Sequence, residues 1–191
     1  MMSQIFVSGH KSPDTDSIAA ALSYSYLKRR LGMDAVAVRA GEINKESRFA
    51  LDYFNLEEPM LVTSVARKNP EDEKQKVILV DHNESKQTID GMDDAEVLEI
   101  IDHHRFGDFE SENPIFILVR PVGCVNTVIY GLYKANHIKP SREIAGIMLS
   151  AIISDTVLFR SPTTTEEDKE TAKELAEIAG VDYEAYGMEM L

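Results

Sequence analysis

The sequence has one cysteine, Cys124, and no long uninterrupted apolar stretch. A single cysteine cannot form an internal disulfide, which agrees with a reducing compartment and predicts a small core residue at this position. A membrane-spanning helix needs about 20 apolar residues. The first residues, Met1-Met2-Ser3-Gln4, also lack the charged start and apolar core of a signal peptide. We therefore expect a cytoplasmic protein without a membrane segment.

Basic residues are also scarce. The 191 residues include 20 lysines and arginines against 33 acidic residues, which gives a net charge of −13. Such a surface repels the phosphate backbone of nucleic acids, so we expect no nucleic-acid partner. Hydrophobic residues make up 43% of the chain, which is enough for a core of its own. Carboxylates that bind metal ions would explain part of the acidic excess.

Short apolar runs alternate with segments of helical spacing along the chain. The runs at 77–80 and 97–101 are apolar and β-branched, which is typical of strands buried on both faces of a parallel sheet. Further strands are expected at 5–7, 35–38, 60–65 and, near a sheet edge, 116–119. Helices are expected at 17–31, ended by Gly32, at 44–54, with Asn44 as N-cap, and at 125–136, 142–153 and 166–179. The helix at 142–153 is strongly apolar and expected to be buried, and 67–76, which has no apolar residue, is expected to be a loop. This alternation predicts an α/β fold, with a mainly parallel β-sheet flanked by helices on both faces.

Acidic and imidazole side chains occur where several of these elements begin or end. They are His10, Asp14, Asp16, Asp81, His103, His104 and Asp155. The carboxyl ends of parallel strands meet at one edge of a sheet, where open α/β sheets bind ligands. Asp155 ends a helix, where the helix dipole disfavours a carboxylate unless a cation compensates it. We expect these side chains to converge on one site.

Four carboxylates and two imidazoles can supply two metal ions with three or four ligands each if Asp81 bridges the ions. Asp14 and Asp16 are two residues apart, a spacing that suits two metals better than one. A mixed oxygen and nitrogen set without thiolate favours Mn²⁺ or Co²⁺. Two such ions about 3.5–4 Å apart activate a water and clamp the oxygens of a displacement at phosphorus. The pattern therefore indicates phosphoester or phosphoanhydride hydrolysis.

Each motif taken alone has a simpler explanation. Asp14 and Asp16 can complement the dipole of the helix that follows them. Asp81-His82 and Asp102-His103-His104 can be solvated turns at strand ends, and Asp155 can be exposed to water. The coincidence of all these motifs in one chain favours the metal site.

Four motifs, in this order, resemble the DHH phosphoesterase superfamily and, more closely, the family II inorganic pyrophosphatases. They are Gly9-His10-Lys11-Ser12-Pro13-Asp14-Thr15-Asp16-Ser17-Ile18, Val80-Asp81-His82-Asn83-Glu84, Ile101-Asp102-His103-His104-Arg105 and Leu149-Ser150-Ala151-Ile152-Ile153-Ser154-Asp155-Thr156. The similarity continues to Tyr186-Gly187. It implies that residues 1–187 are a DHH-type catalytic domain that hydrolyses pyrophosphate to two phosphates, and that 188–191 begin an interdomain linker.

The resemblance also implies roles for individual residues. One metal would be held by His10 and Asp14, the other by Asp16, His103 and Asp155, with Asp81 bridging. His104 would be a catalytic residue that faces the substrate, and Asp102 would orient an imidazole from behind. Ser12 stands where the family usually has Asn, so a hydroxyl would replace an amide near the leaving group. Mn²⁺ or Co²⁺ would occupy both sites, and Mg²⁺ would arrive with pyrophosphate.

Members of the family carry a second, C-terminal domain whose basic residues clamp the substrate, and this sequence stops about where the linker would begin. We therefore expect weak substrate binding and low turnover from the chain alone. The resemblance further implies a homodimer formed through this domain, for which the strand at 116–119 is the candidate edge.

Two alternatives stay open. The first is a DHH phosphoesterase that acts on short oligonucleotides or cyclic dinucleotides, although those enzymes commonly have Gly where this chain has Thr15. The second is a metal-binding dimerisation domain without turnover. The role of His82, which follows the proposed bridging ligand, is also left open as a residue behind the metal ligands.

Overall fold

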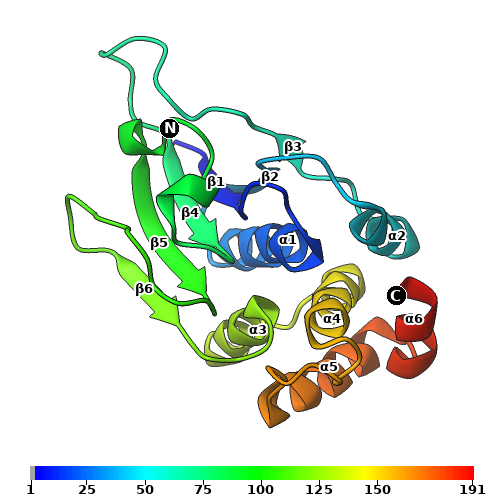
Figure 1. The fold of residues 1–191 in the computed structure, drawn as a ribbon. Helices are drawn as coiled ribbons and strands as arrows, with labels where there is room; N and C mark the ends of the chain where they lie inside the picture. The colour runs from blue at the N-terminus through cyan, green and yellow to red at the C-terminus, as the bar shows by residue number, and fades with distance from the viewer. Residues whose placement is uncertain (1–2) are drawn as a thin grey trace.

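The computed structural model describes residues 3–191, which are built around one parallel sheet (Figure 1). The strand order is β3-β2-β1-β4-β5-β6, and every neighbouring pair is parallel. The strands are β1 (Ile5–Ser8), β2 (Ala35–Arg39), β3 (Met60–Leu61), β4 (Lys76–Val80), β5 (Glu96–Asp102) and β6 (Phe116–Val119). The chain runs outward from β1 to β3, returns to the middle at β4, and then runs outward to β6. Its direction across the sheet therefore changes between β1 and β4.

The two faces of the sheet are covered differently (Figure 1). The α-helices gather on one face and are α1 (Thr15–Arg30), α2 (Lys45–Tyr53), α3 (Val125–Ala135), α4 (Arg142–Thr156), α5 (Glu166–Ala179) and α6 (Tyr183–Met190). Their buried apolar side chains share one cluster with that face. The 3₁₀ helices η1 (Ser85–Gln87) and η2 (Met92–Asp94) lie between β4 and β5 in the sequence. The opposite face packs against loops and η2, with the buried Ile89 and the partly buried Met92 in its apolar cluster. The predicted α/β fold class with a mainly parallel sheet is confirmed. The six α-helices all lie on one face, and loops with the short η2 helix cover the face where further helices were expected.

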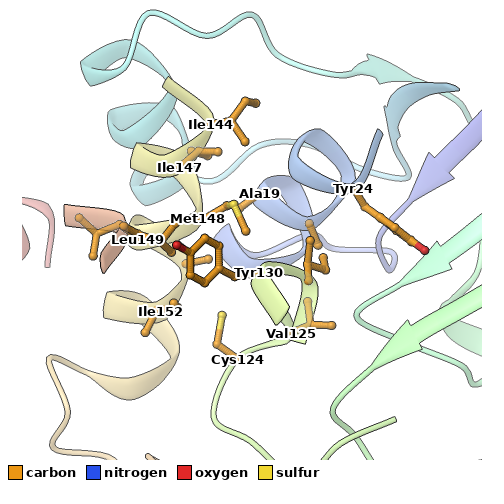
Figure 2. Packing of buried hydrophobic residues seen from close by; sticks show 14 of the residues in the cluster. Ala19, Tyr24, Cys124, Val125, Tyr130, Ile144, Ile147, Met148, Leu149 and Ile152 are labelled. Carbon is orange, nitrogen blue, oxygen red and sulfur yellow. The ribbon is translucent and has the colours of Figure 1, made fainter. Parts of the chain in front are cut away.

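Helix α4 lies inside the helical layer, as its strongly apolar sequence predicted. It packs between α1 and α5, and its Ile147, Leu149 and Ile152 side chains are fully buried (Figure 2). A helix that is apolar all round is stable only where other elements surround it. This packing carries the C-terminal end of α4, with Asp155, toward the beginning of α1.

Local sequence signals explain where several helices start and stop. Asn44 is the N-cap of α2, as predicted, and its side chain accepts a hydrogen bond from Ser47 N at 2.7 Å. Gly32 follows the end of α1 with a positive φ of 88°, a conformation that glycine adopts without strain. Gly180, also at positive φ, ends α5. The loop expected at 67–76 is present up to the start of β4 at Lys76.

The strand predicted at 60–65 is wrong beyond Leu61. Within residues 3–191, β3 pairs with β2 alone, which ends at Arg39 opposite Leu61. Beyond Leu61, Val62 N still donates to the carbonyl of Arg39, and Ser64 forms an isolated bridge with Asp90 in place of a continued ladder. The domain boundary expected at residue 187 stays a prediction: α6 continues through Gly187 to the buried Met190, and residues 1 and 2 lie outside the described residues. Among residues 3–191, no helix has the length and apolar character to cross a membrane.

Candidate metal centre

The predicted side chains come together at the carboxyl edge of the sheet. The change of direction between β1 and β4 puts their carboxyl ends next to each other, the usual ligand position in open α/β sheets. His10 follows β1, Asp81 follows β4, and His103 follows β5. The beginning of α1 adds Asp14 and Asp16, and the end of α4 adds Asp155.

The first group of potential metal ligands is His10, Asp14 and Asp81. His10 Nε2 lies 3.5 Å from Asp14 Oδ2 and 3.3 Å from Asp81 Oδ2. The other ring nitrogen of His10, Nδ1, lies 2.7 Å from the carbonyl oxygen of Lys11. A proton on Nδ1 donates to that carbonyl, which leaves Nε2 directed at the two carboxylates. Asp14 is held as the N-cap of α1 by Ser17 N at 2.9 Å.

The second group is Asp16, His103 and Asp155. His103 Nε2 lies 3.4 Å from Asp16 Oδ2 and 3.9 Å from Asp155 Oδ2. Its Nδ1 is 2.9 Å from the carbonyl oxygen of Val122, so this imidazole also presents Nε2 to the carboxylates. Asp14 and Asp16 therefore belong to different groups, in agreement with their spacing in the sequence.

Asp81 connects the two groups. Its Oδ2 faces His10, as above, and its Oδ1 lies 3.2 Å from His103 Nε2. The residue is 1% exposed and has a φ of 61°, a left-handed conformation that aspartate tolerates better than most residues. Ser17 Oγ donates to Asp81 Oδ2 at 2.9 Å, which fixes the carboxylate further. A sharp backbone turn at the end of β4 thus aims one oxygen at each group.

Asp102 and His104 form a pair beside these groups, and His104 also forms a third set of potential ligands with Asp81 and His103. His104 Nδ1 is 2.8 Å from Asp102 Oδ1 and 3.8 Å from Asp81 Oδ1, and the His104 side chain is half exposed. Asp102 is fully buried and also accepts hydrogen bonds from the backbone N–H of His103 at 2.8 Å and from Asn83 Nδ2 at 2.7 Å. The buried carboxylate therefore orients the exposed imidazole.

The charges of the two groups are strongly coupled. Burial and repulsion by Asp16 raise the pKa of Asp155 to about 12. Burial lowers the pKa of His10, but hydrogen bonds to Asp14 and Asp81 outweigh burial and raise it to about 11. Burial also lowers the pKa of His103, but the hydrogen bond to Asp81 and the charge of Asp16 outweigh burial and raise it to about 10. Bound protons offset the negative charge of the crowded carboxylates here, and a divalent cation would offset the same charge.

The donor atoms fit Mn²⁺. Each group offers carboxylate oxygens and one imidazole Nε2, and such a mixed set suits Mn²⁺. The single thiol of the chain, Cys124 Sγ, is a hydrogen-bond donor to Asp16, and burial raises its pKa well above the ordinary value. It therefore remains a thiol.

The sequence did not indicate what surrounds Asp16, which is fully buried. Its carboxylate accepts hydrogen bonds from Cys124 Sγ at 2.9 Å, from the backbone N–H of Val125 at 2.9 Å and from Asn126 Nδ2 at 2.6 Å. These groups form the N-terminal end of α3, where the helix dipole favours a negative charge. The predicted start of a helix near 125 was the only available signal, because these partners are more than 100 residues from Asp16.

A cavity of about 440 Å³ opens beside the two groups. It is lined by His10, His82, Asn83, Glu84, Gln87, His104 and Arg105. The buried His82 places Nδ1 2.8 Å from the carbonyl oxygen of Val80, and its Nε2 has no hydrogen-bond partner among the described residues. Ser12 is exposed, has a φ of 51° and is not part of this lining, so its role at the substrate stays a prediction.

Comparison with known proteins places this geometry in a family. The sequence model for the DHH family, N-terminal domain, matches residues 4–152. The chain belongs to the DHH family. This DHH chain is 53% identical over 190 residues to the "Probable manganese-dependent inorganic pyrophosphatase" of Exiguobacterium sp. and 54% identical to the protein of that name from Bacillus licheniformis. Each alignment covers 100% of this chain and 60% of the relative, so the chain spans about 60% of the length of these curated relatives.

Solved structures share the DHH fold seen here. A protein of Methanococcus jannaschii assigned to the family II inorganic pyrophosphatases superposes with a TM-score of 0.88 at 43% identity. The alignment covers 98% of this chain and 60% of that protein. An exopolyphosphatase-related protein from Bacteroides fragilis, at 19% identity and a TM-score of 0.71, matches over 96% of this chain and 54% of its own length, and shares the fold.

Proposed function

We propose that this chain contains the two-metal catalytic core of a manganese-dependent inorganic pyrophosphatase, which hydrolyses pyrophosphate to two phosphates. The observation that carries the proposal is the position of Asp81, whose two carboxylate oxygens face His10 and His103 in two separate groups of potential ligands. The printed names of the relatives support the metal and the substrate.

In this proposal one Mn²⁺ is held by His10, Asp14 and Asp81, and the other by Asp16, His103, Asp155 and Asp81. Co²⁺ is the alternative ion for both sites, and Mg²⁺ enters with pyrophosphate. When bound, the two ions supply Lewis acidity, which lowers the pKa of water and offsets charge on the phosphoryl oxygens. The carbonyls of Lys11 and Val122 keep the two imidazoles in the tautomer that such ions require.

His104 is the proposed proton donor to the leaving phosphate. Its ring lines the cavity next to Asp81, and its hydrogen bond to Asp102 raises the pKa of His104. The protonated imidazole is therefore favoured, with Nδ1–H directed to Asp102 and Nε2–H free to donate to a phosphate oxygen. Asp102 acts through His104 by holding that orientation.

We also propose that turnover by this chain is low. Arg105 is the single lysine or arginine in the cavity lining, and its side chain is 86% exposed. Pyrophosphate is highly charged, and the chain itself carries a net charge of −13. The same acidic balance supports our proposal that nucleic acid is not a partner. A cytoplasmic location also belongs to this proposal.

We also propose that two copies of the chain form a homodimer through β6. Strand β6 is the last strand of the sheet, and Phe116 and Ile117 on it are 48% and 43% exposed. An exposed apolar edge strand is a template for pairing with another strand, and a second copy of β6 fits it.

Phosphate release from pyrophosphate, with Mn²⁺ and Mg²⁺ present, tests the proposed substrate. The same samples are given a short oligonucleotide and a cyclic dinucleotide. Cleavage of pyrophosphate alone, even at a low rate, supports the proposal. Cleavage of a nucleotide substrate without phosphate release from pyrophosphate would favour the other DHH phosphoesterases, and no cleavage by a chain that binds two ions would favour the dimerisation domain.

A further inference from the structure

A buried carboxylate outside the metal centre, Asp168, accepts an unusual number of hydrogen bonds. It lies in the first turn of α5 and is fully buried. Two of its bonds come from Thr165, through the backbone N–H at 2.8 Å and the hydroxyl at 2.7 Å. Asp168 N donates in return to Thr165 Oγ1 at 3.2 Å, which completes a capping box at the start of α5. Helix capping explains these contacts.

Capping does not explain the other two hydrogen bonds. Asp168 Oδ2 also accepts from the backbone N–H of Gly123 at 2.8 Å, and Oδ1 accepts from Thr127 Oγ1 at 2.6 Å. A Cβ atom at Gly123 would lie 2.8 Å from Asp168 Oδ2, so a larger residue there would displace the carboxylate or the backbone. The carboxylate therefore links α5 to Gly123, in the connection between β6 and α3, and to Thr127, near the start of α3.

This segment, residues 122–127, contacts Asp16 and His103, two members of the second group of potential ligands. The carbonyl of Val122 fixes the His103 ring, and donors from residues 124–126 surround Asp16. Figure 2 shows Cys124 and Val125 from this segment against the helical core. The other group depends on different partners, because His10 is fixed by the Lys11 carbonyl and Asp14 by Ser17 N.

We propose that Asp168 is a positioning residue for the second metal alone. By holding residues 122–127 in place, it keeps Asp16 and His103 in the geometry that this ion requires. The inference rests on the proposed function, since it assumes that the two groups bind metal ions. Hydrogen-bond partners behind metal ligands typically contribute 10–100-fold to affinity, so we expect a loss of about tenfold for a residue one contact further away.

Mn²⁺ titration by calorimetry tests this inference when each site is measured separately. Asp14→Asn leaves the Asp16–His103–Asp155 site for titration, and Asp155→Asn leaves the His10–Asp14–Asp81 site. Asp168→Ala is introduced into both backgrounds, and Mn²⁺ electron paramagnetic resonance provides a second readout of bound ion. We expect about tenfold weaker binding in the first background and unchanged binding in the second.

Three further variants separate positioning from general destabilisation. Asp168→Asn keeps one carbonyl oxygen that can accept from Gly123, so it should restore most of the affinity. If Asp168→Ala does not fold, Thr127→Val takes its place in the test. It removes one hydrogen bond to Asp168 at nearly constant volume and should weaken the same site. Asp182→Ala, which removes the N-cap of α6 and no hydrogen bond of residues 122–127, should change neither site.

The outcomes separate the role of Asp168 from the proposed function. Equal weakening of both sites, or no change at either, would overturn the role of Asp168. Failure of the parent chain to bind two Mn²⁺ ions would instead overturn the proposed function.

Discussion

His103 Nε2 lies 3.2 Å from Asp81 Oδ1, although the two residues are 22 positions apart in the sequence. The contact exists because β4 and β5 are parallel neighbours, so the residues that follow them meet at the same edge of the sheet. It links the second group of potential ligands to the carboxylate that also faces His10. The proposed bridged pair of metal ions depends on this contact.

Replacement of His104 should separate catalysis from metal binding. In His104→Gln the proposed proton donor is lost, while the groups His10–Asp14–Asp81 and Asp16–His103–Asp155 keep all their ligands. Of the three sets of potential ligands, the one formed by Asp81, His103 and His104 loses a member. We expect kcat for pyrophosphate hydrolysis to fall by roughly 10²–10⁴-fold, the usual contribution of a general acid. Steady-state kinetics, combined with Mn²⁺ titration, measures both effects.

His137, exposed after α3, provides the matched control, and His137→Gln should leave both measurements unchanged. An unchanged kcat in His104→Gln would show that another group donates the proton. Loss of both metal ions in that variant would make His104 a ligand.

Removal of metal should lower thermal stability. Bound ions relieve repulsion among Asp16, Asp81 and Asp155, which the folded chain crowds together. A ligand present at 100 times its Kd stabilises a protein by about 2.7 kcal/mol. For a chain of this size that corresponds to roughly 5–10 °C in Tm for each site. Scanning calorimetry with excess Mn²⁺, and then with a chelator, measures the change.

Asp52→Asn, on the exposed surface of α2, should show the same Mn²⁺ response as the parent chain. A Tm that is identical with and without Mn²⁺ would argue against metal binding by the folded protein.

The proposed dimer predicts that a charge on β6 dissociates it. In Ile117→Lys, a lysine at the exposed edge must be desolvated if a second β6 strand pairs there. We expect the variant to be monomeric by light scattering at concentrations where the parent chain is dimeric, with Mn²⁺ affinity unchanged. Met33→Lys, on an exposed apolar residue after α1, is the control. A variant that remains dimeric would place the interface elsewhere. A monomeric parent chain would contradict the proposed dimer.

The sequence predicted the parts of the fold that depend on local patterns. Asn44 begins α2 and Gly32 follows α1, because capping and left-handed backbone conformations are properties of single residues. The convergence of His10, Asp81 and His103 was also predictable, since each follows an apolar strand of one parallel sheet. These expectations needed no long-range information beyond the sheet itself.

Other features depend on contacts that a local pattern does not reveal. Cys124 was expected to be a small core residue, and it is buried, but its thiol also donates to Asp16 across 108 positions. The early end of β3 at Leu61 was missed because it depends on where its partner β2 stops. The role of Asp168 depends on two hydrogen bonds from a segment more than 40 positions away.

The central claim is that two metal ions share Asp81, and Mn²⁺ titration of the parent chain and Asp81→Asn tests it most directly. Calorimetry should find two ions per parent chain. In Asp81→Asn both sites should weaken together by on the order of 100-fold or more, because even partners behind the ligands contribute 10–100-fold. One ion per parent chain, or weakening of a single site in the variant, would contradict the bridged pair.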